Sequence, residues 1–403
     1  MTDAPEIPSG LPVFDDDPFG DEILTNPYAF HERLREAGPV VYLERYGVYA
    51  MGRYDEVYAG LSNWETFVSS RGAGLSDFKK EKPWRPPSLL LESDPPDHTV
   101  VRNALGDVIG PRSIRHLRET FQAEAEVVVD TLLEKGTIDA VTDVAEVYPL
   151  KVFPDAVGIR EDGRENLLPY GALAFNAFGP HNAILENALA TAGPVQEWIA
   201  GSCGREVLSD TGFGASIWAA ADRGEITEAQ APMLVRSLLT AGVDTTVYGI
   251  TNMLYSMVTH PEQWEALHAD PSLAKFAFDE ALRFESPVQT FFRTSSRESV
   301  VSGVTIPADV KVLFFLGSAN RDRRKWGADA ETYDITRESS GHVAFGMGIH
   351  QCVGQPIARL EVESVMSALA RRVRSIKPAG TPTPQLNNTL KGWSSVPIEL
   401  IPA

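Results

Sequence analysis

Residues 345–354 read FGMGIHQCVG and contain one of the two cysteines of the chain. Cys352 precedes the run GQPIARLEVESVMSALARRV, whose helical periodicity places its sulfur near the N-terminus of a helix. Free backbone N–H groups at that end favour a thiolate. Gly346, Gly348 and Gly354 carry no side chains, so a large flat group can approach the backbone closely. A thiolate among N–H donors suits an axial ligand of iron.

The residues alone leave other interpretations of this segment open. A lone cysteine in a glycine-rich turn is most often a small buried hydrophobic residue. A zinc site would have only His342, His350 and Cys352 as ligands, at irregular spacing. A dinucleotide-binding loop would need a third glycine where Gln351 stands. A cysteine nucleophile would need a partner histidine and an oxyanion site, for which the sequence has no signature.

Composition narrows the class of protein. The chain has 403 residues, and its 43% hydrophobic content is ample for a large core. A net charge of −19 argues against general binding to nucleic acid or to an anionic membrane. Two cysteines exclude a disulfide framework and fit a reducing compartment, so we expect a cytoplasmic protein. Residues 1–19 are acidic, with no basic n-region and no apolar h-region, so they are not expected to be a signal peptide. The longest apolar run, Val312–Leu316, is far too short to span a bilayer.

Helical periodicity dominates the pattern, with a minor β region, so we expect one α+β unit. Residues 1–20 are predicted to be a loose N-terminal arm and residues 21–403 a single domain. Periodicity and turn residues predict a hairpin at 38–50, an irregular proline-rich loop at 83–97, a helix ending at Gly136, a long buried helix over 228–258, a helix at 272–284, and strands within 299–315 and 395–401.

The pattern Phe-x-x-Gly-x-His-x-Cys-x-Gly resembles the haem-binding loop of the cytochrome P-450 monooxygenases. Other segments of that family occur in order along nearly the whole chain. The resemblance implies a mainly helical triangular prism, with haem b between the long central helix and the Cys352 helix, and Cys352 as the ligand of the haem iron. It implies that the haem and its propionates are held by His98, Arg102, Arg293, Phe345, Gly346, His350 and Gly354.

Residues 241–246 read AGVDTT in the middle of the predicted long helix. Gly242 is expected to leave space beside the helix for O₂ and water. Thr245 can turn its hydroxyl to the carbonyl four residues earlier, which loosens the helix locally. The resemblance implies that Thr245 and Asp244 form the acid–alcohol pair that delivers protons during catalysis.

A second family segment is structural. Glu280 and Arg283 stand three residues apart on a helix, a spacing that by itself is common on solvated faces. The resemblance implies that this pair is buried and joined by Arg337. Relatives commonly have proline at the position of Arg323, so the local shape of this segment is expected to differ from theirs while the chemistry is not affected.

Five stretches resemble the members of the family that O-demethylate 4-methoxybenzoate: residues 70–92, 167–180, 234–246, 284–294 and 387–393. A carboxylate in an apolar cavity needs hydrogen-bond donors, and arginine and serine recur on two of these stretches. Thr240 stands where serine is expected, which adds a methyl group near the pocket. The expected substrate pocket consists of Arg85, Ser88, Leu91, Phe175, Phe178, Arg236, Ser237, Thr240, Ala241, Val288 and Phe291.

The resemblance also implies partners. The chain has no flavin or iron–sulfur segment, so electrons are expected from a [2Fe–2S] ferredoxin and its NAD(P)H-linked reductase, with O₂ as co-substrate and the enzyme as a monomer. Two alternatives remain: oxidation of a different small aromatic acid, and a non-catalytic haem-thiolate sensor. The candidate ferredoxin contacts are Arg112, Arg115, Arg118, Arg359, Arg371 and Arg372.

Overall fold

The computed structural model describes residues 10–403 and is mainly helical. The helices are α1 Asp21–Thr25, α2 Tyr28–Ala37, α3 Tyr54–Ser62, α4 Asp97–Val108, α5 Pro111–Lys135, α6 Val147–Val157, α7 Leu167–Asn176, α8 Ala183–Ala190, α9 Ala192–Gly201, α10 Phe213–Asp222, α11 Gln230–Ala241, α12 Asp244–Thr259, α13 Pro261–Ala269, α14 Ala274–Glu285, α15 Leu316–Ala319, α16 Arg323–Trp326 and α17 Gln355–Arg372.

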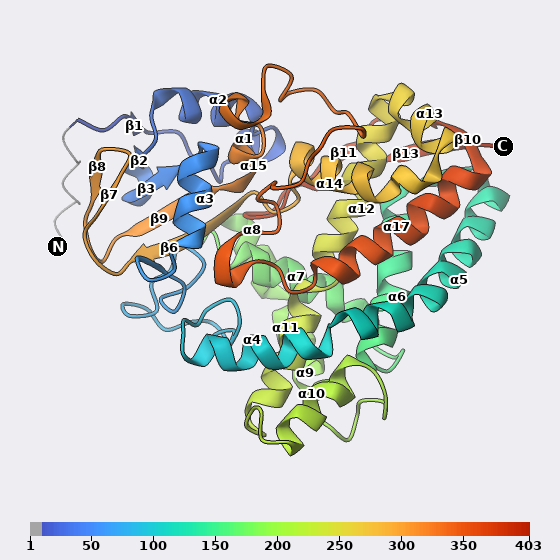
Figure 1. Cartoon of the computed structure of the whole chain (residues 1–403), viewed down its shortest axis with the longest axis horizontal. Helices are drawn as coiled ribbons and strands as arrows, with labels where there is room; N and C mark the ends of the chain where they lie inside the picture. Colours follow the sequence, from blue (N-terminus) through green and yellow to red (C-terminus); the bar gives the residue numbers. More distant parts are fainter. Residues whose placement is uncertain (1–9) are drawn as a thin grey trace.

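The strands form one large sheet and three small ones. Their bounds are β1 Val13–Phe14, β2 Val41–Leu43, β3 Val48–Met51, β4 Phe67–Val68, β5 Thr137–Asp139, β6 Thr290–Ser295, β7 Ser299–Val301, β8 Val304–Ile306, β9 Lys311–Phe315, β10 Val373–Pro378, β11 Thr383–Gln385, β12 Gly392–Ser395 and β13 Pro397–Pro402. The large sheet has the order β1-β2-β3-β9-β6-β4 and lies to one side of the helices, in the left half of Figure 1.

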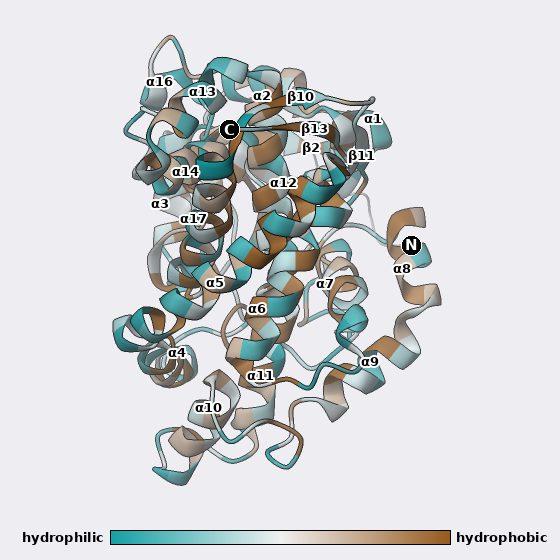
Figure 2. Ribbon diagram, turned by 90° about the vertical axis from the view of Figure 1, so that its right-hand side faces the viewer, coloured by the Kyte–Doolittle hydropathy of each residue, from teal (hydrophilic) through white to brown (hydrophobic). Residues whose placement is uncertain are grey.

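The helical core packs around α12, which is buried along most of its length. The helices α5 and α17 pack against each other and α17 also packs on α14, so these elements enclose one continuous hydrophobic core. Figure 2 shows hydrophilic and hydrophobic segments in turn along α5, as expected for a helix with one face in the core. No helix in residues 10–403 has the length and apolar content needed to cross a membrane.

Several predicted elements are confirmed. The hairpin at 38–50 is the antiparallel pair β2–β3, and the proline-rich loop precedes α4 without regular structure. Helix α5 ends at Lys135, and Gly136 adopts a left-handed φ of 71° while its N–H bonds to Leu132 O. The helix predicted at 272–284 is α14, and strands lie within 299–315 and 395–401.

Two predictions need correction. The long helix over 228–258 is two helices, α11 and α12, because the backbone leaves helical hydrogen bonding at Gly242–Val243. The N-terminal arm is not loose in its described part: β1 pairs in parallel with β2, and Phe19 is buried in a hydrophobic cluster. Residues 1–9 of the predicted arm lie outside the described residues.

Candidate active site

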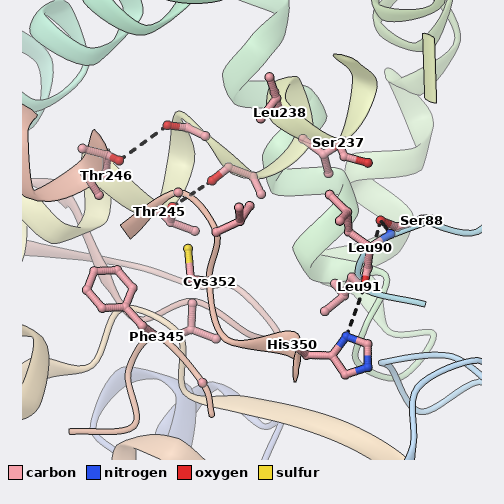
Figure 3. A pocket seen from close by; sticks show the side chains of 18 of the residues that line it. Ser88, Leu90, Leu91, Ser237, Leu238, Thr245, Thr246, Phe345, His350 and Cys352 are labelled. Atoms are coloured by element: carbon pink, nitrogen blue, oxygen red, sulfur yellow. Dashed lines mark hydrogen bonds between the residues drawn. The ribbon is translucent and has the colours of Figure 1, made fainter. Parts of the chain in front are cut away.

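A cavity of about 240 Å³ lies between the Cys352 segment and the break between α11 and α12. The sulfur of Cys352 points into this space toward Thr245 and Thr246 (Figure 3). All eleven residues of the predicted substrate pocket line the cavity, together with Arg102, Arg293, Phe345, His350 and Cys352. The fold thus brings together side chains from segments more than 250 positions apart.

The loop before α17 holds Cys352 by its backbone. Its N–H donates to Phe345 O at 2.8 Å. Gly346 and Gly348 have left-handed φ values of 69° and 67°, and a Cβ on Gly348 would lie 3.0 Å from Leu61 O, so both positions require glycine.

Burial raises the pKa of the Cys352 thiol, while the backbone N–H groups of Gly354 and Gln355 and the charge of Arg102 oppose this rise. These N–H groups point at the sulfur, as a thiolate ligand requires. A metal cation at the sulfur would favour the thiolate outright.

Arg102, Arg293 and His350 line one side of the cavity, and His98 lies beside His350 without lining the cavity. The rings of His98 and His350 lie 4.5 Å apart, and the Nε2 atoms of both are buried with no hydrogen-bond partner in residues 10–403. His350 Nδ1 bonds to Leu90 O at 3.0 Å. Arg293 is 4% exposed, and burial lowers its pKa to about 10. Arg102 lines the cavity, and burial also lowers its pKa. Arg102 and Arg293 form no ion pair in residues 10–403, and a buried guanidinium without an anion is costly, so these donors fit the two carboxylates of haem.

Sequence reasoning missed Asp94 at this site. It accepts hydrogen bonds from Ser69 N and Ser70 N at 3.0 Å each, and its carboxylate lies 3.7 Å from His350 Nε2. These contacts lower the pKa of Asp94 to about 2 despite its burial. Its place four residues before His98 was the available signal.

Residues 241–246, AGVDTT, lie at the break between α11 and α12. Thr245 Oγ1 donates to Ala241 O at 2.9 Å, as expected. Gly242 lines the cavity, as expected, but the direction of a side chain is blocked, because a Cβ there would lie 2.1 Å from the ring of Phe153. Thr245 lines the cavity, with Ala241 one turn earlier.

Asp244 does not line the cavity but faces α7. It is 4% exposed, and a Cβ on Gly171 would lie 2.4 Å from its Oδ2. Its Oδ1 has no hydrogen-bond partner in the described part of the chain. Burial, and then the nearby Glu146, raises the pKa of Asp244 well above its usual value. Asp244 is therefore a buried acid whose surroundings favour its protonated form.

One end of the cavity carries four donors from two elements. Arg85 and Ser88 lie on the proline-rich loop, and Arg236 and Ser237 lie on α11. Arg236 ties the two together by donating to Pro86 O at 2.9 Å. Burial, and then the charge of Arg85, lowers the pKa of Arg236.

The hydroxyls at this end differ in their present partners. Ser88 Oγ accepts from Leu90 N and Leu91 N at 3.3 and 3.2 Å, so its proton is available to a ligand. Ser237 Oγ donates to Met233 O at 2.9 Å and must turn or share its proton to bind one. Thr240 Oγ1 donates to Arg236 O at 2.7 Å, so only its methyl group is offered to the cavity.

The remaining wall is apolar. Phe178 makes edge contacts with Phe175 and Phe291, with ring centroids 5.8 and 5.6 Å apart. Leu91 and Val288 pack against the same cluster. This wall suits a flat aromatic ring.

Glu280, Arg283 and Arg337 form one buried network away from the cavity. Arg283 makes a two-pronged ion pair with Glu280, at 2.7 and 2.8 Å, and Arg337 lies 3.3 Å from the same carboxylate. Arg283 also donates to the carbonyls of Asn320 and Ala330, which joins α14 to the segment after α15. Arg323, where the sequence departs from the family, is the first residue of the short helix α16.

Comparisons with known proteins agree with this geometry. Residues 214–401 match the cytochrome P450 family model. The chain is 54% identical, over the full length of both proteins, to cytochrome P450 CYP199A2 of Rhodopseudomonas palustris. It superposes on cytochrome P450 CYP109Q5 from Chondromyces apiculatus with a TM-score of 0.81 and 30% identity, covering 96% and 99% of the two chains. Cytochrome P450 CREJ in complex with (4-ethylphenyl) dihydrogen phosphate gives a TM-score of 0.84 at 26% identity, covering 95% and 98%.

The chain belongs to the cytochrome P450 family. Members of this family are monooxygenases that use O₂ and external electron donors and bind haem b through a cysteine thiolate. The thiolate position of Cys352 and the buried donors around it fit that cofactor.

Proposed function

We propose that the protein O-demethylates 4-methoxybenzoate, and hydroxylates or dealkylates related para-substituted benzoates. The observation that carries this proposal is the cavity itself. Two arginines and two serine hydroxyls stand at one end, aromatic side chains form the wall, and the Cys352 sulfur points into the same cavity. A flat ring held by its acid presents its para substituent toward the haem.

The chain's own residues bind, orient and protonate. Bound haem supplies the activation of O₂ that inserts oxygen into a C–H bond of the methoxy group. Ser88 and Ser237 donate to the carboxylate, with Arg85 and Arg236 balancing its charge. The reaction consumes O₂, two electrons and two protons and yields 4-hydroxybenzoate, formaldehyde and water.

Product analysis tests this proposal. The holoenzyme, supplied with a [2Fe–2S] ferredoxin and its reductase, should convert 4-methoxybenzoate to 4-hydroxybenzoate and formaldehyde in equal amounts. Reductant consumption without either product would contradict the proposed reaction.

Proton delivery in this proposal runs from Asp244 to Thr245. Asp244 is buried in surroundings that raise its pKa, and Thr245 lines the cavity one residue later. We expect Thr245→Ala to consume reductant while forming at least about tenfold less product per electron pair, because the hydroxyl that orients the proton is gone. The measurement is the ratio of product to NADH, with Thr245→Ser as the control that keeps the hydroxyl. Equal ratios in Thr245→Ala and the parent would remove Thr245 from the proton path.

The electron donor in this proposal is an acidic ferredoxin that docks on the cysteine side of the haem. The six candidate arginines differ in whether they already form an ion pair within the protein. Arg118 lies 3.1 Å from Glu363, Arg359 lies 3.0 Å from Asp279, and Arg371 and Arg372 pair with Glu126 and Asp130. Arg112 and Arg115 are exposed, with no carboxylate of residues 10–403 within ion-pair distance.

We therefore expect the double variant Arg112→Gln, Arg115→Gln to slow reduction by the ferredoxin by about tenfold at low salt. The slope of the rate against ionic strength should also flatten, because fewer charge contacts are screened. The measurement is stopped-flow reduction at several salt concentrations, with Arg371→Gln as the control. An unchanged rate and slope would contradict docking on this face.

A different aromatic acid is the second candidate substrate. Two guanidinium groups, those of Arg85 and Arg236, stand at the donor end of the cavity, and the related cytochrome P450 CREJ has been solved in complex with an aryl phosphate. The charge at the head-group end of the cavity therefore bears directly on which acid is bound.

A further inference from the structure

Glu92 lies behind the donor end of the cavity and joins two of its donors. Its side chain is 4% exposed. Its Oε2 accepts from Ser88 N at 2.8 Å and from Arg85 NH1 at 3.1 Å. Its own N–H donates to Ser88 O at 3.0 Å. Residues 88–92 therefore form a turn closed by both the backbone and the side chain of Glu92.

This turn fixes where the donors point. Because the backbone of Ser88 is held by Glu92, its hydroxyl oxygen is held in place to accept from the two amides that follow. Arg85 lies between Glu92 and the ring of Trp84, whose centroid is 5.3 Å from the guanidinium carbon. With the bond from Arg236 to Pro86 O, the loop is oriented relative to α11 before a substrate arrives.

Glu92 also sets the charge of this end. Arg85 and Arg236 contribute +2, and Glu92 contributes −1, which leaves +1. A carboxylate brings −1 and is balanced. A doubly charged phosphate or phosphonate would leave a net negative charge beside an apolar wall, which is costly at low dielectric.

We propose that Glu92 is a positioning and specificity-determining residue, which orients Arg85 and Ser88 and restricts the cavity to aromatic acids whose head group carries a single negative charge. This inference rests on the proposed function, since it assigns the head group of the substrate in the same cavity. Glu92 does not line the cavity and acts through Arg85 and Ser88.

The test compares two probes of the same ring. The ferric holoenzyme is titrated with 4-methoxybenzoate and with 4-methoxyphenylphosphonate, at a pH where the phosphonate is doubly charged, and binding is followed by the haem spin-state shift. The quantity of interest is the ratio of the two dissociation constants. A general loosening of the site changes both constants and leaves this ratio unchanged.

We expect Glu92→Gln to move the ratio at least about tenfold toward the phosphonate, because the site then carries +2. Glu92→Asp keeps the charge and should weaken both probes while holding the parent ratio. Glu81→Gln, which removes the same charge from an exposed position bonded to Ser76 Oγ, should leave both constants unchanged.

The outcomes separate the two proposals. A response of the parent protein to benzoate, with an unchanged ratio in Glu92→Gln, overturns the role of Glu92 and leaves the proposed function standing. An equal change of ratio in Glu92→Asp overturns charge matching as well. No response of the parent protein to either acid overturns the proposed function and this inference with it.

Discussion

Replacing Cys352 with alanine should remove the thiolate-haem spectrum and all monooxygenase turnover. The sulfur lies at the N-terminal end of α17, with the N–H groups of Gly354 and Gln355 directed at it. No other side chain on the cavity wall is a thiol, since Cys203 is buried elsewhere in the helical core. The variant therefore has no axial donor that can tune the iron as a thiolate does. The measurement is the absorption spectrum of the ferrous carbonyl complex, together with product formation.

Cys203→Ser is the matched control for this variant. Cys203 is 2% exposed and its Sγ contacts Ile199 O at 3.1 Å, a bond that a serine hydroxyl can also make. We expect this control to keep both the spectrum and the turnover. A fully active Cys352→Ala protein would refute the assignment of the iron ligand.

Removing the hydroxyls of both Ser88 and Ser237 should weaken the binding of 4-methoxybenzoate by at least about a hundredfold. A hydrogen bond to a charged group contributes about 1.5–3 kcal/mol, and each 1.4 kcal/mol is about tenfold in affinity. Ser88 has its proton free and should contribute more than Ser237, whose hydroxyl already donates to Met233 O. The measurement is the dissociation constant of the acid for Ser88→Ala, Ser237→Ala and the double variant.

Ser216→Ala is the matched control for the Ser88 and Ser237 variants. Ser216 donates to Gly212 O at 2.9 Å, the same bond within one helical turn that Ser237 makes, but it is exposed and far from the cavity wall. Its removal should leave the affinity unchanged. If the double serine variant bound the acid as tightly as the parent, the carboxylate would have to be held elsewhere.

The fold could be predicted where local signals were strong. Helix α5 has a clear apolar period and ends at a glycine, and the β2–β3 hairpin has β-branched and aromatic residues around a turn. Strand β6 was missed because most of its residues are buried on both sides, so it lacks the alternation that marks a strand. Strand β10 was also missed, because it follows α17 directly and no glycine or proline marks the end of the helix.

Thr245 indicated a local loosening of the helix, but the complete break between α11 and α12 was not predicted because apolar periodicity continues through it. Gly242, at the break, packs against the ring of Phe153, a contact that only the fold brings about. The same holds for Asp244, whose place next to Gly171 on α7 and off the cavity wall depends on how two helices pack.

The residues of the site also fall into those that sequence predicts and those that only the fold reveals. Cys352 and its glycines follow from a local pattern, and the pocket residues followed from a resemblance to the family. Glu92 stands at the end of an apolar run with no partner visible in sequence, and only the fold shows its bonds to Arg85 and Ser88. Hydrogen-bond partners that depend on the conformation of a loop can be identified only from the structure.

The most direct test of haem binding and carboxylate recognition in this cavity is an optical titration of the ferric holoenzyme with 4-methoxybenzoate, compared with the uncharged 4-methoxybenzamide. We expect a shift from low-spin to high-spin haem with the acid, and binding of the amide at least about a hundredfold weaker, because only the acid balances the net charge of Arg85, Arg236 and Glu92. Equal affinity for both compounds, or a haem spectrum that responds to neither, would contradict carboxylate recognition in this cavity.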